Sequence, residues 1–241
     1  MRYLVTCAYN GANYFGWQKQ VNVKTVQEEI ETVISRFFNE NIIIHASGRT
    51  DAKVHALGQA FHFDAAKSDK SKLLYSLNKM LPNDIKLLTI KTVKDSFHAR
   101  YSAKQKTYRY DILLIDKDPF NRELILFYPY LFDIKRFEDA LSLFVGCHDF
   151  KSFTSKPSDE GKFIREIFSI TVKQKGQKIS TTFVGSGFMQ GQIRMMIATC
   201  LAVASGKIET DYIKLRLNNE ARNTTCYKVD GQGLYLVKVK Y

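Results

Sequence analysis

The loop Gly48-Arg49-Thr50-Asp51 combines residue types that can carry out chemistry. In extended backbone, residues two apart project to the same side, so Arg49 and Asp51 would place a guanidinium beside a carboxylate. The cation keeps the carboxylate ionised, and an ionised aspartate can act as a nucleophile or as a base. The alternative interpretation is an Asx turn with a surface ion pair, which has no catalytic role.

A second stretch, residues 94–109, has a composition typical of RNA binding, because cations contact phosphates and aromatic rings stack on bases. Its single acidic residue is Asp95. Its cationic residues are Lys94, Arg100, Lys104, Lys106 and Arg109, and its interleaved aromatic residues are Phe97, Tyr101 and Tyr108. The alternative is an exposed strand edge whose lysines prevent pairing with other chains.

Arg194 lies between apolar residues in the middle of a predicted helix over residues 188–205. An arginine in such a setting is expected to have a buried or anionic partner. The alternative is a side chain that runs along the apolar surface and keeps its charged end in water.

The sequence predicts no metal site. His55 and His62 flank a predicted strand, but no third ligand has suitable spacing, which also argues against a metal hydrolase. The four cysteines are too far apart for paired zinc ligands or for a disulfide scaffold, and we expect reduced thiols. They are Cys7, Cys147, Cys200 and Cys226.

Composition narrows the class of protein. The chain has 241 residues, of which 45% are hydrophobic, too many for a disordered chain. Its net charge of +12 favours a polyanionic partner such as nucleic acid, although a basic but otherwise ordinary enzyme would share it. Its apolar runs are too short to span a bilayer, and its N-terminus has no signal-peptide pattern. We therefore expect a cytoplasmic protein without a membrane partner.

Hydrophobic periodicity predicts an α+β fold with a mostly antiparallel sheet. Each half of the chain shows a β-α-β-β pattern, and turn-forming residues at 116–122 place the boundary between halves 1–115 and 116–241. The predicted strands are 2–9, 58–64, 85–93, 106–115, 163–175, 178–184 and 234–241. One predicted helix begins after Thr25, and the others span residues 71–80, 134–144 and 188–205.

An ordered set of motifs runs along most of the chain, and with it the sequence resembles the TruA family of tRNA pseudouridine synthases. These motifs are Tyr9-Asn10-Gly11, Phe15-Gly16-Trp17-Gln18-Lys19-Gln20, Gly48-Arg49-Thr50-Asp51, Phe97-His98-Ala99-Arg100, Tyr108 with Tyr110, Gln192-Ile193-Arg194 and Gly233-Leu234. The resemblance implies isomerisation of uridine within RNA, without a cofactor. It also implies two ferredoxin-like halves that share a central sheet, an active cleft between them, and a homodimer.

The resemblance assigns a role to each matching residue. Asp51 matches the essential aspartate, and Arg49 would position RNA and assist extrusion of the target nucleotide. Arg194 would pair with Asp51 and hold it charged. Tyr108 would stack on the uracil, and Leu234 would form apolar pocket wall.

The sequence departs from the family in three places, which leave the isomerase residues intact. Lys53 stands where the family has glycine, Asn10 where it has aspartate, and Val229-Asp230 where it has Ala-Pro. We expect Lys53 to contact RNA together with three cations of the basic stretch, Arg100, Lys104 and Lys106. The expected targets are uridines 38–40 of the tRNA anticodon arm. The alternatives are a divergent relative that modifies ribosomal RNA or another tRNA position, and an RNA-binding protein or chaperone without catalysis.

Overall fold

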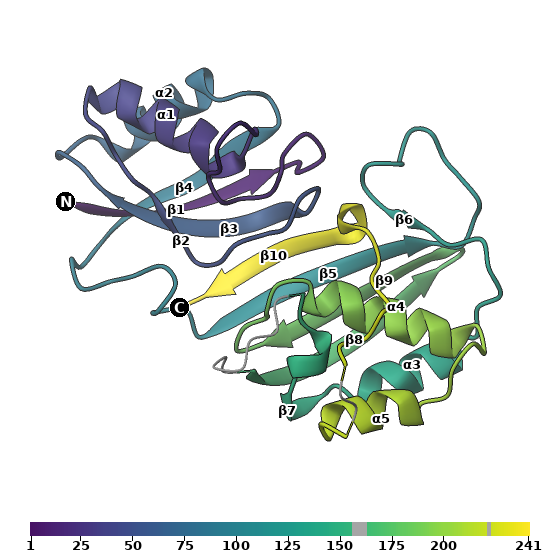
Figure 1. Ribbon diagram of the computed structural model, residues 1–241. Coiled ribbons are helices and arrows are strands. Elements are labelled where there is room, and N and C mark those ends of the chain that lie inside the picture. The colour runs from purple at the N-terminus through teal and green to yellow at the C-terminus, as the bar shows by residue number, and fades with distance from the viewer. Residues whose placement is uncertain (156–162, 221–222) are drawn as a thin grey trace. The chain divides into compact units, whose positions relative to one another are not determined.

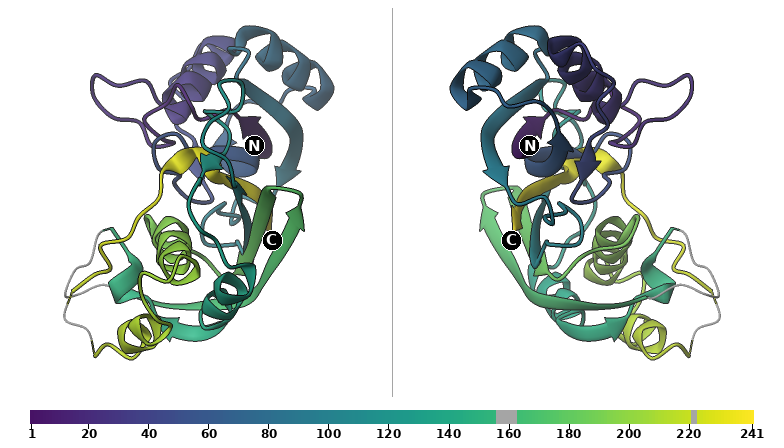
Figure 2. Two further views of the ribbon diagram at one scale, coloured as in Figure 1. Left: turned by 90° about the vertical axis from the view of Figure 1, so that its right-hand side faces the viewer. Right: turned by 90° about the vertical axis from the view of Figure 1, so that its left-hand side faces the viewer.

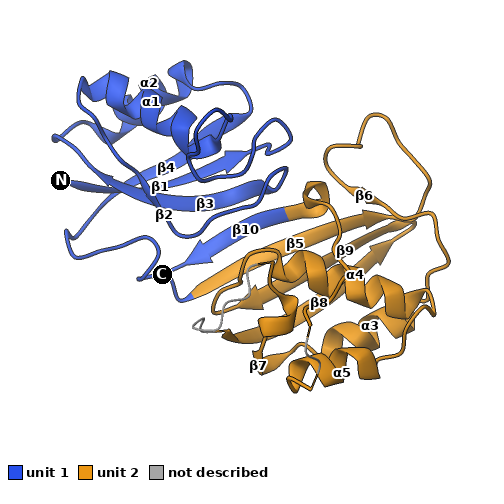
Figure 3. Ribbon diagram, in the orientation of Figure 1, with its two compact units in different colours: residues 1–104, 235–241 blue, residues 105–234 orange. Residues whose placement is uncertain are grey.

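The computed structural model describes residues 1–155, 163–220 and 223–241, which form two compact units (Figure 3). The first unit contains Met1–Lys104 and Tyr235–Tyr241, and the second contains Gln105–Leu234. The sequence placed the boundary after residue 115 and kept the last strand in the second half. The structure differs because residues 116–122 form a turn inside the second unit, between two strands that pair with each other.

The first unit has the β-α-β-β-α-β order of a ferredoxin-like fold (Figure 1). Its elements are β1 (Arg2–Tyr9), α1 (Val26–Phe38), β2 (His45–Ala46), β3 (His55–Asp64), α2 (Lys70–Met80) and β4 (Ile85–Val93). The strands β4, β1, β3 and β2 are neighbours in that order, and all three pairs are antiparallel. The beginning of β3 also pairs, in parallel, with β10 (Leu234–Lys240), part of which belongs to this unit.

Alternation along β1 explains why this sheet has one helix-covered face. Tyr3, Val5, Cys7 and Tyr9 are buried, and the residues between them are half-buried. Both α1 and α2 cover the same face (Figure 2), and α1 turns its buried positions toward it at helical spacing. The helix begins after Thr25 as predicted, but the threonine side chain makes no capping hydrogen bond.

The second unit repeats the β-α-β-β-α order with additional short elements. It contains β5 (Gln105–Leu113), β6 (Leu126–Phe127), α3 (Ile134–Ser142), β7 (Gly146–Asp149), β8 (Ile164–Lys175), β9 (Lys178–Gly185), α4 (Gln192–Ala204) and α5 (Asp211–Leu217). The strands β5, β9, β8 and β7 are neighbours in antiparallel pairs, and β6 pairs in parallel with β5. The predicted α+β class and the mostly antiparallel pairing are thus confirmed within each unit.

Helix α4 places Arg194 differently from the prediction. The helix begins at Gln192 rather than at residue 188, because Gly191 adopts a positive φ of 74° at its N-terminus. Arg194 therefore lies in the first turn and not in the middle of the helix. Of the described residues of α4, Arg194 is the one that is not buried.

Candidate active site

The predicted catalytic loop, residues 48–54, is held by main-chain hydrogen bonds to the loop that follows β1. The amide of Trp17 donates to the carbonyl of Thr50 at 3.1 Å, and the amide of Lys53 donates to the carbonyl of Tyr14 at 3.2 Å. These two bonds bracket Asp51. The backbone on both sides of the predicted catalytic carboxylate is therefore fixed by a second loop.

Two glycines make this close approach between the loops feasible. A Cβ atom on Gly16 would lie 2.6 Å from the carbonyl oxygen of Thr50, and one on Gly11 would lie 2.0 Å from that of Val54. Gly16 also has a φ of +94°, which side chains other than glycine rarely adopt. Any larger residue at either position would push the predicted catalytic loop away.

Hydrogen bonds from buried side chains also hold the predicted catalytic loop. The hydroxyls of Tyr9 and Thr50 are hydrogen-bonded at 2.8 Å, and both side chains are buried. Gln59 of β3 donates from Nε2 to the carbonyl of Gly48 at 2.9 Å and accepts from the Ser47 hydroxyl at 2.8 Å. Buried, satisfied polar contacts of this kind hold a backbone in one conformation.

The residues that flank Thr50 lie closer to solvent. Arg49 is exposed and Asp51 is half-buried, while Thr50 between them is buried. This alternation agrees with the expectation that Arg49 and Asp51 project to one side. A half-buried carboxylate on a fixed backbone has the placement that a nucleophile or base requires.

His55, at the start of β3, makes contacts that hold neighbouring segments in place. Its Nδ1 accepts a hydrogen bond from the Gly11 amide at 3.0 Å, and its ring stacks on Tyr235 of β10 at 4.7 Å. Within the described part of the chain, no group of three or more His, Cys, Asp or Glu residues is placed to hold a metal ion.

In the second unit, Tyr108 of β5 has its ring almost fully buried. It is 8% exposed and meets Phe188 edge-on, with 5.3 Å between ring centroids. Lys106 is two residues earlier on the same strand and is half-exposed. The edge-on contact with Phe188 therefore fixes the orientation of the Tyr108 ring.

The segment that precedes β10 is fastened to α4 and β5. Arg194 donates from Nε to the carbonyl of Val229 at 2.8 Å, and the Tyr110 hydroxyl donates to the carbonyl of Asp230 at 2.8 Å. Burial raises the pKa of Tyr110, so this hydroxyl remains a donor. Leu234, at the end of the segment, is buried.

Comparison with known proteins decides the family. Residues 6–102 and 140–241 match the family model described as tRNA pseudouridine synthase. The chain belongs to this family. A tRNA pseudouridine synthase A 1 of Bacillus cereus is 38% identical over 239 residues, which cover 98% of this chain and 97% of that protein.

Other tRNA pseudouridine synthases are similar in sequence along almost the whole chain. A tRNA pseudouridine synthase A of Exiguobacterium sp. is 39% identical and covers 97% of this chain and 95% of its own length. One of Streptococcus pyogenes is 37% identical and covers 100% of this chain and 99% of its own length. Among solved structures, the match to a chain of a Cbf5-Nop10-Gar1 complex spans 82% of this chain and 54% of that chain. The sequence identity is 11% and the TM-score is 0.35.

The nine residues predicted from the sequence are divided between the two units. The first unit contains Arg49, Asp51, Lys53, Arg100 and Lys104, and the second contains Lys106, Tyr108, Arg194 and Leu234. The structure brings Arg49, Asp51 and Lys53 together on one loop. The pair formed by Asp51 and Arg194 joins residues of different units and stays a prediction.

Lys53 is the departure from the family pattern that the backbone explains. It has a φ of +63°, and the other described non-glycine residues with positive φ are the asparagines Asn22, Asn39 and Asn219. Asparagine tolerates this region, and a lysine there bears a steric cost that glycine avoids. The lysine side chain is exposed, so the departure adds a cation beside Asp51.

Sequence reasoning did not assign the residues that hold the catalytic loop. Tyr9, Gly11 and Gly16 were recognised as family motifs without a role, and Gln59 was likewise unassigned. Their spacing relative to Asp51 has no periodic signature, because they contact its neighbours Gly48, Thr50 and Val54 from other parts of the first unit. The two glycines were the available signal, since a glycine in a loop often marks a close approach of two backbones.

The described part of the chain contains no helix that combines the length and the apolar character needed to cross a bilayer.

Proposed function

We propose that this chain isomerises uridine to pseudouridine in tRNA, at positions 38–40 of the anticodon arm, with Asp51 as the catalytic residue. The observation that carries the proposal is the fixed loop that presents Asp51, in a chain that matches tRNA pseudouridine synthases along almost its entire length.

The reaction requires a carboxylate and a closed pocket. The bond between the ribose and N1 of uracil breaks, the uracil turns over, and C5 of uracil bonds to the same ribose carbon. C5 loses its proton and N1 gains one. No atom is gained or lost, so the reaction needs no redox partner or external group. Asp51 would attack the ribose, attack the uracil or remove a proton, and the three routes share the need for an ionised carboxylate.

Two arginines support an ionised Asp51 in this proposal. Arg49 is two residues away on the same loop. Arg194 lies in the first turn of α4, and the positive end of the helix dipole favours an anion there. The described residues of α4 include no acidic residue that would already occupy this position. With its Nε bonded to Val229, the Arg194 guanidinium is oriented by the segment before β10, and its remaining donors would hold the carboxylate.

The target base must leave its stack before it can react, and this costs a few kcal/mol. Tyr108 would receive the uracil on its ring, and Leu234 would form apolar wall beside it. The cost of extrusion is offset by contacts to phosphates, for which Lys53, Arg100, Lys104 and Lys106 are candidates. The net charge of +12 supports the same role.

Two further expectations and one alternative belong with this proposal. The protein would act as a homodimer, with RNA crossing both subunits, and it would work in the cytoplasm where tRNA matures. Because Lys53 and Val229-Asp230 depart from the family, the specific alternative is a different target, either in ribosomal RNA or at another tRNA position.

The test is pseudouridine mapping on tRNA transcripts and on total RNA from cells with and without the gene. We expect product at positions 38–40 with the wild-type protein and none with Asp51→Ala, while RNA affinity is retained. Asp139→Ala, which removes an exposed carboxylate of α3, is the matched control and should behave as wild type. Product confined to other positions would overturn the target, and bound RNA without product would favour a chaperone.

A further inference from the structure

We infer that residues 92–104 form a second nucleotide-binding site, which holds an unpaired nucleotide of the RNA substrate away from the catalytic loop. The identity of the ligand as RNA rests on the proposed function. The site itself rests on a cavity, an exposed aromatic platform and the contacts that fix both.

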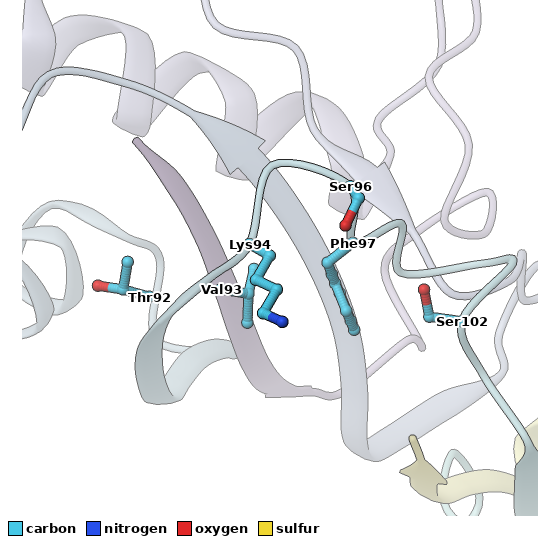
Figure 4. Close-up of a pocket in the computed structure, with 6 residues that line it drawn as sticks. All are labelled: Thr92, Val93, Lys94, Ser96, Phe97 and Ser102. Carbon is cyan, nitrogen blue, oxygen red and sulfur yellow. The ribbon is translucent and has the colours of Figure 1, made fainter.

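The cavity has a volume of about 680 Å³ and is lined by Thr92, Val93, Lys94, Ser96, Phe97 and Ser102. Figure 4 shows the Lys94 amine and the Phe97 ring extending in the same direction from neighbouring parts of this segment. An ammonium group, an aromatic ring and three hydroxyls suit a phosphate, a base and a sugar respectively. The hollow is open to solvent, which suits a nucleotide that remains part of an RNA chain.

The platform is Tyr101, whose side chain is 78% exposed. The His98 ring lies 4.4 Å from the Tyr101 ring at an angle of 35°, and the Arg100 guanidinium lies 5.9 Å from the Tyr101 centroid. An exposed aromatic ring beside a cation offers a face on which a nucleic-acid base can stack. A base stacked on Tyr101 would have Arg100 close to the adjoining phosphate.

A group of histidines supports the platform from the sheet. The His98 ring meets His62 of β3 at 4.7 Å, and His62 stacks on His45 of β2 at 5.0 Å. The amide of Ala99 donates to Nδ1 of His62 at 3.2 Å. The platform is therefore pre-organised, which reduces the entropic cost of binding.

Arg2 fixes the other end of the segment. Its guanidinium donates to the carbonyl of Phe97 at 2.8 Å and to that of Asp95, while a salt bridge joins it to Asp64 of β3. The turn that carries Lys94 and Phe97 is thereby held on the edge of the sheet. Both parts of the site have a backbone that does not depend on the ligand.

The charge of this segment suits an anionic ligand such as the phosphates of RNA. Lys94, Arg100 and Lys104 are the cations of residues 92–104, against Asp95 alone. His55 directly follows the catalytic loop, and His62, further along β3, supports the platform. At about 3.3 Å per residue, the platform therefore lies roughly 20 Å from the catalytic loop. The nucleotide bound here is therefore not the target uridine but one several positions away.

The experiment compares Tyr101→Ala with Tyr75→Ala. Tyr75 of α2 is a matched control, because it is 66% exposed and Lys79 lies 5.6 Å from its ring centroid. We measure Kd for a tRNA transcript, KM and kcat, and the melting temperature of each variant. Tyr101→Ala should weaken binding and raise KM about ten-fold, and Tyr101→Phe should restore both because it keeps the stacking ring.

Lys94→Ala and Lys79→Ala form the second pair. Lys94→Ala should reduce the slope of log K against log salt by about one, the value for one lost phosphate contact, while Lys79→Ala leaves the slope unchanged. The second site is refuted if Tyr101→Ala binds RNA as tightly as Tyr75→Ala does. RNA binding is measured without catalysis, so a wild-type protein that binds through Tyr101 and forms no product would overturn the proposed function and leave this site standing.

Discussion

Gly16 approaches Thr50 so closely that a Cβ atom on residue 16 would lie 2.6 Å from the Thr50 carbonyl oxygen. The next residue, Trp17, donates its amide to that same oxygen. The two loops therefore meet through their backbones immediately before Asp51. This contact makes the position of the catalytic loop depend on a residue far from it in the sequence.

Gly16→Ala should accordingly lower both stability and activity. The new methyl group meets main chain that cannot rotate away, and φ is positive, so we expect a loss of about 2 kcal/mol or more in unfolding free energy. We also expect kcat to fall by at least about ten-fold, since small misplacements of catalytic groups are costly. Gly176→Ala is the control, because Gly176 has a φ of +58° with nothing within 4 Å. Equal loss of activity in both variants would contradict the role of the contact.

Lys53→Gly should stabilise the fold by up to about 1 kcal/mol, because glycine removes the steric cost of a positive φ at a smaller cost in chain entropy. It should also weaken RNA binding, since an exposed cation beside Asp51 is lost. Chemical denaturation and RNA titration measure the two effects. Asn22→Gly is the control, as Asn22 has a φ of 62° and asparagine tolerates it. A Lys53→Gly protein less stable than wild type would refute the account of strain.

Tyr110→Phe should raise KM and lower kcat by a few-fold. The change removes the hydroxyl that donates to Asp230, which costs about 1 kcal/mol and loosens the segment leading to Leu234. Tyr3→Phe is the control, because the Tyr3 hydroxyl donates to the carbonyl of Ala66 at 3.1 Å and accepts from the amide of Ser68 at 2.9 Å in the first unit. Tyr3→Phe should lose at least as much stability as Tyr110→Phe, and only Tyr110→Phe should lose activity in steady-state assays.

His62→Gln should make stability less dependent on pH. Burial, and next the charges of His98, His45 and Arg2, lower the pKa of His62 from 6.5 to about 4. The unfolded state thus binds more protons than the folded state between these values, and stability is lost as the pH falls from about 6.5 to 4. Denaturant unfolding at several pH values should show that the unfolding free energy of His62→Gln changes less steeply with pH. The glutamine can still accept a hydrogen bond from the Ala99 amide. An unchanged pH dependence would show that His62 does not titrate in this way.

The sequence predicted the regular elements well because their periodicity is local. Strands β1 and β4 have the predicted bounds, and α2 differs by one residue at its start. Helix α5 was not predicted, because its seven residues are too few for a periodic signal. The start of α4 was predicted four residues early, since the apolar pattern continues through a glycine whose φ the sequence does not reveal.

The candidate site was predictable as a list of residues and not as a set of contacts. The family motifs named Asp51, Tyr108 and Arg194 together. They did not reveal that Arg194 donates to the Val229 carbonyl, because a backbone acceptor has no preferred residue type. Nor did they reveal that His45, His62 and His98 gather beneath Tyr101, since strand pairing between β2 and β3 brings the first two together.

The parallel pairing of β10 with β3 has a consequence for synthesis of the protein. Tyr235 pairs with His55 and stacks on it, directly after the catalytic loop. Because His55 is synthesised long before Tyr235, this edge of the first unit cannot close until β10 has been translated. Until then the nascent chain exposes an unpaired strand edge directly after the predicted catalytic loop.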